Sequence, residues 1–247
     1  MKLTKHVYLV GSGLQGIHLT DAYDCHVYLI DGGDELALID TGAGMGVEQI
    51  LQNIKDEGFH LDKLKYLLLT HGHADHSGGT KKLVEKTGIQ VISSQLTAQY
   101  LENGDEESIS LSFAKNAGFY PIDYVYEATP VDRIVKEGDI VTVGNLQLKV
   151  IETPGHSNDH LSYIMKTPES TYLFGGDLVF YEGKVATQFI PDCSVFDIGN
   201  SLLKLKDENI DCLLPGHDVF ILKQGQSHIN RAIDSIERLV IPSSIIY

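Results

Sequence analysis

Three histidines and an aspartate fall within six residues of one short turn, where their side chains can bind a metal ion together. The turn reads HGHADHSGG over residues 71–79. Glycine and other small residues between the polar ones let the backbone fold tightly and direct several side chains at one point. Imidazole nitrogens and a carboxylate suit zinc, and also iron or manganese. Taken alone, the stretch has a second interpretation, a polar loop that is merely rich in histidine.

Three more potential ligands each follow a glycine at the end of a predicted strand. His156 ends the sequence TPGH, Asp177 ends FGGD and His217 ends PGH. Rigid strands fix the positions of residues at their ends, and loops present the side chains, so site residues of α/β proteins gather there. The candidate metal ligands are therefore His71, His73, Asp75, His76, His156, Asp177 and His217.

The elements that must position these residues follow from apolar periodicity and turn signals. We predict strands at 7–10, 27–30, 36–39, 67–69 and 89–92, with helices at 47–57 and 80–87 between the later ones. A second series of strands is expected at 133–135, 140–143, 146–151, 163–164, 171–174 and 212–214, and helices at 194–208 and 226–239. This order fits a layered α/β domain.

The stretch Gly11–Gly16 reads GSGLQG, which matches the GxGxxG pattern of dinucleotide-binding proteins. That pattern requires a helix and a parallel crossover after the first strand. Residues 17–26 show no clear helical periodicity, and the turn at 31–35 predicts an antiparallel hairpin. We therefore favour a glycine-rich loop over a nucleotide site.

Asp40 ends the predicted strand at 36–39 and has two interpretations. It can cap the segment that follows, which is the ordinary role of aspartate in such a place. It can also lie beneath the metal site and orient a ligand histidine. The ligands further along the chain favour the second role.

Residues 94–130 differ from the rest, because helices are predicted at 95–103 and 109–117 and aromatic residues gather within and after them. These helices can be a simple core pair. They can also form a helical insert that serves as a lid, since aromatic side chains suit the wall of an apolar ligand pocket.

Composition narrows the class of protein. The chain has 247 residues, a formal net charge of −15 and 43% hydrophobic residues. The acidic balance argues against a nucleic-acid partner, which requires basic surface. No apolar run has the roughly 20 residues needed to span a bilayer, and no signal-peptide pattern opens the chain. We expect a cytoplasmic protein that acts on a small molecule and has no membrane partner. Its oligomeric state stays open, and a homodimer is one of the possibilities.

At these motifs the sequence resembles the metallo-β-lactamase fold superfamily, in particular its glyoxalase II and lactonase-like branch. The HxHxDH motif of that family is complete at residues 71–76, and TPGH, FGGD and PGH match its later ligand motifs in order. The resemblance runs from about residue 7 to residue 217. It implies an α/β fold, a four-layer αββα sandwich of two mixed β-sheets flanked by helices, with residues 1–247 forming one domain.

The resemblance also implies a role for each ligand. His71, His73 and His156 would hold one metal ion, Asp75, His76 and His217 a second, and Asp177 would bridge them, with Asp40 supporting a ligand. The cofactors would be two divalent metal ions. Zinc is the expected metal, and iron or manganese are the alternatives. A hydroxide bridging two such ions is a nucleophile at neutral pH, and Asp75 could orient it or move a proton as a catalytic residue.

Departures from known members narrow the expected substrate. Cysteine does not occupy position 177, so β-lactam hydrolysis is not expected as the main activity, and only 30 residues follow His217, fewer than the glutathione-binding domain of glyoxalase II needs. Quorum-quenching lactonases have tyrosine three residues after the bridging aspartate, whereas here Phe180 and then Tyr181 follow Asp177. We therefore assign these two residues to the substrate pocket.

We predict a dinuclear metal-dependent hydrolase that cleaves a small ester, thioester or lactone. Three alternatives stay open: a phosphodiesterase-type hydrolase, an iron-dependent thiol or persulfide dioxygenase, and a non-catalytic metal- or ligand-binding protein of the same fold.

Overall fold

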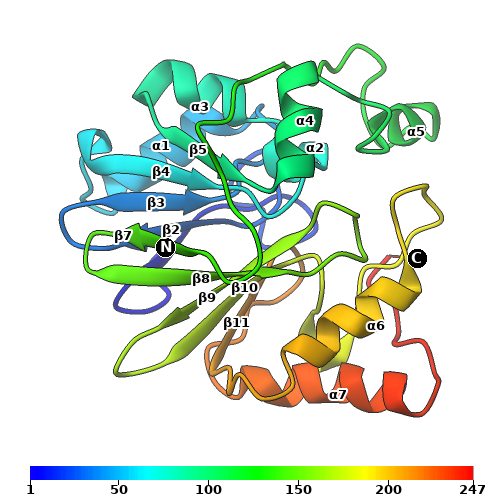
Figure 1. Ribbon diagram of the computed structural model, residues 1–247. Helices are drawn as coiled ribbons and strands as arrows, with labels where there is room; N and C mark the ends of the chain where they lie inside the picture. Colours follow the sequence, from blue (N-terminus) through cyan, green and yellow to red (C-terminus); the bar gives the residue numbers. More distant parts are fainter. Residues whose placement is uncertain (247) are drawn as a thin grey trace.

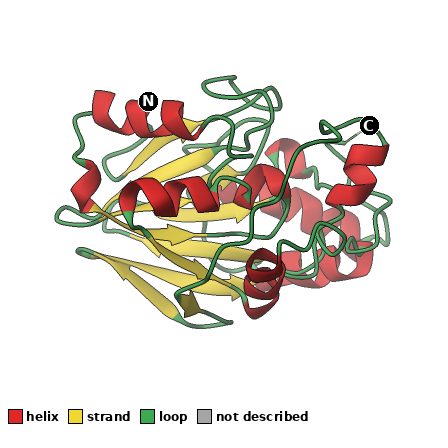
Figure 2. Ribbon diagram, turned by 90° about the horizontal axis from the view of Figure 1, so that it is seen from above, coloured by secondary structure: helices red, strands yellow, loops and turns green. Residues whose placement is uncertain are grey.

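Two β-sheets face each other, and helices cover the outer side of each one. The computed structural model describes residues 1–246. Figure 1 shows α1 and α3 above the first sheet, and α6 and α7 on the far side of the second. Seen from above, helices lie over the strands (Figure 2). The predicted four-layer αββα sandwich is confirmed.

The elements have the following bounds. The first sheet contains, in spatial order, β1 (Val7–Gly11), β2 (Val27–Asp31), β3 (Leu36–Ile39), β4 (Leu64–Leu68), β5 (Gln90–Ser93) and β6 (Arg133–Ile134). The second contains β11 (Cys212–Pro215), β10 (Thr171–Gly176), β9 (Leu161–Lys166), β8 (Leu146–Glu152) and β7 (Ile140–Val143). The helices are α1 (Val47–Asp56), α2 (Ala74–Ser77), α3 (Thr80–Thr87), α4 (Gln95–Asn103), α5 (Leu111–Asn116), α6 (Val195–Lys204) and α7 (Gly225–Glu237), with short 3₁₀ turns at Leu61–Lys63 and Tyr181–Gly183.

Both sheets are mixed, and their pairing excludes a dinucleotide-binding fold. β1, β2 and β3 pair antiparallel, whereas β3, β4, β5 and β6 pair parallel. In the second sheet only β10 and β11 are parallel. Because β1 and β2 are antiparallel, the glycine-rich stretch at 11–16 connects two antiparallel strands, and the parallel crossover that a nucleotide site requires is not formed there.

Most strand residues are buried on both faces, so the core has three apolar layers. Val7 and Leu9 of β1 point between the sheets, while Tyr8 and Val10 point toward α1. This period of two is the ordinary alternation of a strand. A third layer lies between the second sheet and α6 and α7. Three apolar layers between four structural layers explain why so much of the chain is hydrophobic.

Buried tyrosines connect the two sheets by hydrogen bonds. The hydroxyl of Tyr163 on β9 donates to the carbonyl of Leu69, just after β4, at 2.7 Å. The hydroxyl of Tyr28 on β2 donates to the carbonyl of Pro215 at the end of β11, also at 2.7 Å. Both bonds lie near strand ends that carry candidate metal ligands, so they fix the two sheets relative to each other close to the site.

Residues 94–130 contain the two predicted helices, α4 and α5, separated and followed by loops. Their role as a lid stays a prediction. In residues 1–246, no helix is long and apolar enough to cross a membrane.

Replacing Tyr163 by phenylalanine should lower the free energy of unfolding by about 1–2 kcal/mol, because the buried carbonyl of Leu69 loses its donor. Urea unfolding followed by circular dichroism measures the change. Tyr172→Phe is the matched control, since Tyr172 is also buried and its hydroxyl donates no hydrogen bond within residues 1–246. Equal stability of the two variants would contradict the role given to Tyr163.

Candidate metal centre

The seven candidate ligands come from the carboxyl ends of four strands and meet at one place. His71 and His73 follow β4, Asp75 and His76 lie in α2, and His156, Asp177 and His217 follow β8, β10 and β11. All except His73 and Asp75 are buried, and those two are partly buried. The two sheets therefore each supply part of one site.

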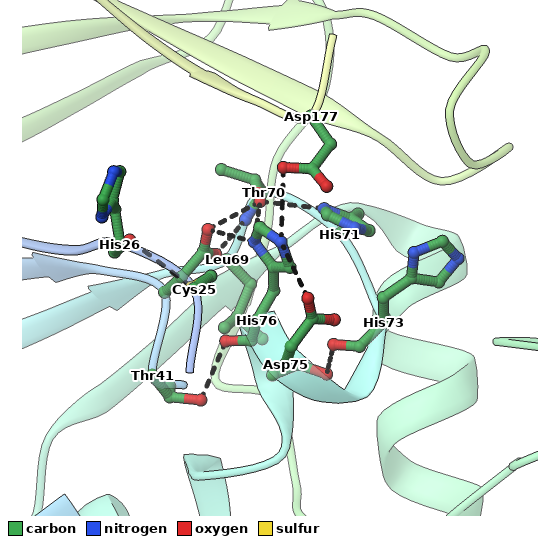
Figure 3. A network of polar contacts seen from close by, with 12 residues as sticks. Cys25, His26, Thr41, Leu69, Thr70, His71, His73, Asp75, His76 and Asp177 are labelled. Carbon is green, nitrogen blue, oxygen red and sulfur yellow. Dashed lines mark hydrogen bonds and ion pairs between the residues drawn. The ribbon is translucent and has the colours of Figure 1, made fainter. Parts of the chain in front are cut away.

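The ligand atoms form two clusters of the kind that holds a metal ion, joined by a third. His71, His73 and His156 form one cluster, and Asp75, His76 and His217 form another, with the potential ligand atoms of each within 4.8 Å of one another. A further cluster of His71, His76 and Asp177 connects the two. Figure 3 shows Asp177 and Asp75 approaching the His76 ring from opposite sides.

Asp40 and Thr70 fix the protonation of two of these rings. Asp40 Oδ2 accepts a hydrogen bond from His76 Nδ1 at 2.9 Å and from Thr70 Oγ1 at 2.8 Å. Since the Thr70 hydroxyl donates to Asp40, it accepts from His71 Nδ1, 3.0 Å away. In their neutral forms, both imidazoles therefore turn an unprotonated Nε2 toward the cluster. Asp40 thus orients His76, and it does so from a left-handed backbone conformation with φ 62°.

Two further partners orient the other cluster. His73 Nε2 donates to Asp192 Oδ2 at 2.8 Å, and His156 Nδ1 donates to the carbonyl of Ala186 at 3.0 Å. The remaining nitrogens, His73 Nδ1 and His156 Nε2, then face each other at 3.0 Å. In the neutral imidazoles both carry lone pairs, and only a proton or a metal cation between them relieves the repulsion.

Asp177 lies between the two clusters. Its Oδ1 is 3.4 Å from His76 Nε2, and its Oδ2 is 3.5 Å from both His156 Nε2 and His217 Nε2. Asp177 Oδ1 and His71 Nε2 are buried and have no hydrogen-bond partner within residues 1–246. Buried acceptors without partners are costly, and a cation satisfies both at once. The donor set therefore fits metal ions, with nitrogen and carboxylate ligands suited to zinc.

Burial and neighbouring charges favour the metal-binding form of three of the seven candidate ligands. Burial, together with neighbouring His76 and His73, lowers the pKa of His71 well below its ordinary value, and burial lowers the pKa of His156 to about 4. Burial opposes ionisation of Asp75, but His76 and His217 outweigh it, so the pKa of Asp75 falls to about 2. At neutral pH these two imidazoles are thus neutral and this carboxylate is ionised, which are the forms that bind metal.

Three residues that support the site were not assigned a role from the sequence. Asp192 accepts a hydrogen bond from His73 Nε2 and another from Ser110 Oγ at 2.6 Å, which connects the 94–130 segment to a ligand. Asp159 Oδ2 accepts from the backbone N–H of Gly72 at 2.7 Å, and His160 Nε2 accepts from that of Asp177 at 3.0 Å. For Asp159 and His160 the only sequence signal was that they follow His156 closely, and Asp192 lies beside no ligand motif.

The glycine before each single ligand has a steric reason. A Cβ at Gly155 would overlap the backbone of Ile198, and one at Gly176 would lie 2.5 Å from His160 Nε2. A Cβ at Gly216 would overlap Asp177 Oδ1 and lie 2.5 Å from His76 Cε1. The glycines therefore allow chain segments and ligands to approach more closely than any other residue permits.

A cavity of about 630 Å³ opens beside the clusters. Five of the candidate ligands contribute to its lining, namely His73, Asp75, His156, Asp177 and His217. Most of its remaining wall is apolar and comes from the loop after β1, the region around α5, the loop before α6 and the C-terminal segment.

The assignment of Phe180 and Tyr181 to the substrate pocket needs correction, because neither residue lines this cavity. Phe180 is fully buried in the protein, and Tyr181 packs against His228 of α7, with 4.9 Å between the ring centroids. The 3₁₀ turn at Tyr181–Gly183 contacts α7, because the backbone N–H of Glu182 donates to His228 Nδ1 at 3.0 Å, and the Tyr181 ring therefore lies against that helix.

Comparison with known proteins gives the family. A model of the metallo-beta-lactamase superfamily matches residues 20–217. A hydroxyacylglutathione hydrolase of Erythrobacter litoralis is 32% identical over 67% of this chain and 51% of its own length. An atrochrysone carboxyl ACP thioesterase of Aspergillus fumigatus is 25% identical over 86% of this chain and 56% of its own length. The chain thus spans about half the length of these curated relatives.

Solved structures agree on the fold. A metallo-beta-lactamase from Cronobacter sakazakii superposes with a TM-score of 0.75 at 22% identity, covering 97% of this chain and 95% of that one. At this level of identity the likeness concerns the fold alone. Because the family model extends over most of the chain and includes every candidate ligand, the chain belongs to the metallo-beta-lactamase superfamily.

Gly216→Ala should weaken zinc binding more than about tenfold, because the added methyl group displaces Asp177 and His76, and even indirect disturbance of ligands costs that much. Competition with a chromogenic chelator measures the affinity. Gly175→Ala is the control, since a Cβ there meets its nearest neighbour at an ordinary 3.6 Å. Wild-type affinity in Gly216→Ala would show that the close approach is not required.

Asp192→Asn should lower zinc affinity by about 10- to 100-fold, the range found when the partner of a ligand histidine is changed. The amide keeps an acceptor for His73 but removes the charge that favours its N–H. Asp207→Asn, at an exposed position between α6 and β11, controls for loss of one negative charge. If both variants bind zinc like the wild type, Asp192 does not position His73.

Proposed function

We propose that this protein is a dinuclear metal-dependent hydrolase that cleaves a small ester, thioester or lactone. The observation that carries the proposal is the arrangement of seven ligands in two joined clusters at the floor of a cavity. Two relatives support the reaction class, since one is named a hydroxyacylglutathione hydrolase and the other an ACP thioesterase.

Each protein group has a defined task in this proposal. His71, His73 and His156 would hold one ion, Asp75, His76 and His217 would hold the other, and Asp177, which lies between the two clusters, would serve both. Two divalent ions, zinc in the first place, supply Lewis acidity and a water that ionises near neutral pH. Iron and manganese are the other candidates for this ligand set.

Asp75 is the residue we assign to proton handling. It lines the cavity, its side chain is 26% exposed, and its Oδ2 lies 3.1 Å from His217 Nε2. With a pKa of about 2 it is ionised at neutral pH. An ionised carboxylate in this place accepts a hydrogen bond from an attacking water and holds it toward a carbonyl in the cavity.

The surroundings expected from the sequence are part of the proposal: a small-molecule substrate, no nucleic-acid or membrane partner, and a cytoplasmic location. The oligomeric state is open, and size-exclusion chromatography with light scattering would distinguish a monomer from a homodimer.

Asp177→Ala should remove at least one of two metal ions and most of the activity, because Asp177 contacts both clusters. Elemental analysis of protein purified in metal-free buffer, with no metal added, should give close to two ions per chain in the wild type. Two ions retained in the variant would refute the bridging role of Asp177, and a single iron in the wild type would favour the dioxygenase alternative.

A substrate panel tests the reaction class on the zinc-loaded protein. Thioesters, lactones and aryl esters should be hydrolysed, and removal of zinc by a chelator should abolish turnover until zinc is restored. Bis-nitrophenyl phosphate as the best substrate would favour a phosphodiesterase. Tight binding of one compound without turnover of any would favour a binding protein.

A further inference from the structure

The cavity beside the metal clusters has a charge pattern that selects among substrates. Among its lining residues within 1–246, none is lysine or arginine, and the charged ones are Asp24, Asp75 and Asp177. Two of these aspartates belong to the metal clusters. Asp24 is held by other groups, since its carboxylate accepts hydrogen bonds from Thr20 Oγ1 at 2.6 Å and from the backbone N–H of Ala43 at 2.8 Å.

The nearby cationic side chain on α5 is also engaged elsewhere. Lys115 forms an ion pair with Glu106 at 2.5 Å, and its side chain is only 10% exposed. Its ammonium lies 6.0 Å from the centre of the Tyr124 ring. The walls therefore offer no cation to a substrate carboxylate or phosphate, in a chain whose formal net charge is −15.

The walls instead offer apolar surface from segments that are distant in sequence. Phe113 on α5, Phe119 after it and Phe189 in the loop before α6 are 55%, 70% and 99% exposed. Ile245 and Ile246 from the C-terminal segment complete the lining. In Figure 1, α5, the loop before α6 and the C-terminus lie on the same side of the molecule. Exposed aromatic rings around a concave site are typical of a ligand wall.

From these observations we propose that the substrate is a neutral ester, thioester or lactone with an extended apolar substituent, which lies between Phe113, Phe119 and Phe189. This inference rests on the proposed hydrolase function and gives its substrate class. The reacting carbonyl lies at the metal clusters, and the apolar substituent covers the exposed rings. A glutathione thioester, which carries two carboxylates, is a poor fit to these walls.

The first test compares substrates on the zinc-loaded protein. For butanoyl, hexanoyl and octanoyl thioesters of one neutral thiol, kcat/KM should rise by about fourfold for each methylene that is buried. Replacing the chain end by a carboxylate, as in a succinyl thioester compared with the butanoyl one, should lower kcat/KM at least tenfold. A glutathione thioester preferred over the neutral thioester of the same acyl group would overturn the inference and leave the hydrolase intact.

The second test uses variants at exposed rings, where folding is not at risk. Phe113→Ser and Phe189→Ser should flatten the dependence of kcat/KM on chain length. Phe196→Ser is the matched control, because Phe196 is 78% exposed on α6 and does not line the cavity; its chain-length dependence should equal that of the wild type. Ala114→Lys, which adds a cation to the wall, should raise the relative kcat/KM of the succinyl thioester.

A binding measurement separates this inference from the reaction class. Nile red, a neutral apolar fluorophore, should bind the zinc-loaded wild type, and Phe189→Ser should weaken binding while Phe196→Ser does not. Absence of turnover on every ester, thioester and lactone would overturn the hydrolase proposal, whereas this binding result would still support an apolar ligand. Equal binding by all three proteins would overturn the apolar site.

Discussion

The structure depends on a set of buried ring nitrogens and carboxylate oxygens that face one another and require a cation. His71 Nε2 and Asp177 Oδ1 have no partner within residues 1–246, and His73 and His156 turn nitrogens toward each other. Such a cluster is unfavourable in an apolar interior unless positive charge lies within it. Everything around the cluster serves to hold these atoms in place despite that cost.

The ligands are held by partners from many parts of the chain. Asp40, at the end of β3, orients His76 directly and His71 through Thr70. Asp192, from the loop before α6, orients His73. The site exists only where both sheets meet, so the buried hydrogen bonds from Tyr163 and Tyr28 between the sheets also maintain its geometry. Stability of the sandwich and affinity for metal are therefore coupled.

In the hydrolase that we propose, chemistry and recognition lie on different elements. The strand ends supply the metal ligands, and rigid strands keep these positions fixed. Recognition falls to the 94–130 segment, the loop before α6 and the C-terminal segment, which surround the same cavity. Asp192 contacts both parts, since it binds His73 on one side and Ser110 on the other. Movement of the cavity wall at Ser110 would therefore change the position of His73 through Asp192.

The sequence alone indicated most of the strands and helices, and it singled out the seven candidate ligands that the structure gathers in joined clusters, because each depends on local signals: apolar periodicity, turn glycines and the HxHxDH spacing. It also favoured a loop over a nucleotide site at Gly11–Gly16, and the antiparallel pairing of β1 and β2 agrees. Only the tertiary structure showed which residues line the cavity. Phe180 and Tyr181 lie close to Asp177 in sequence, yet Phe180 is fully buried in the protein and Tyr181 packs against His228 of α7. Asp192 lies 119 residues from His73 and still contacts it. Contacts of this kind depend on how the two sheets pack, and no local pattern encodes them.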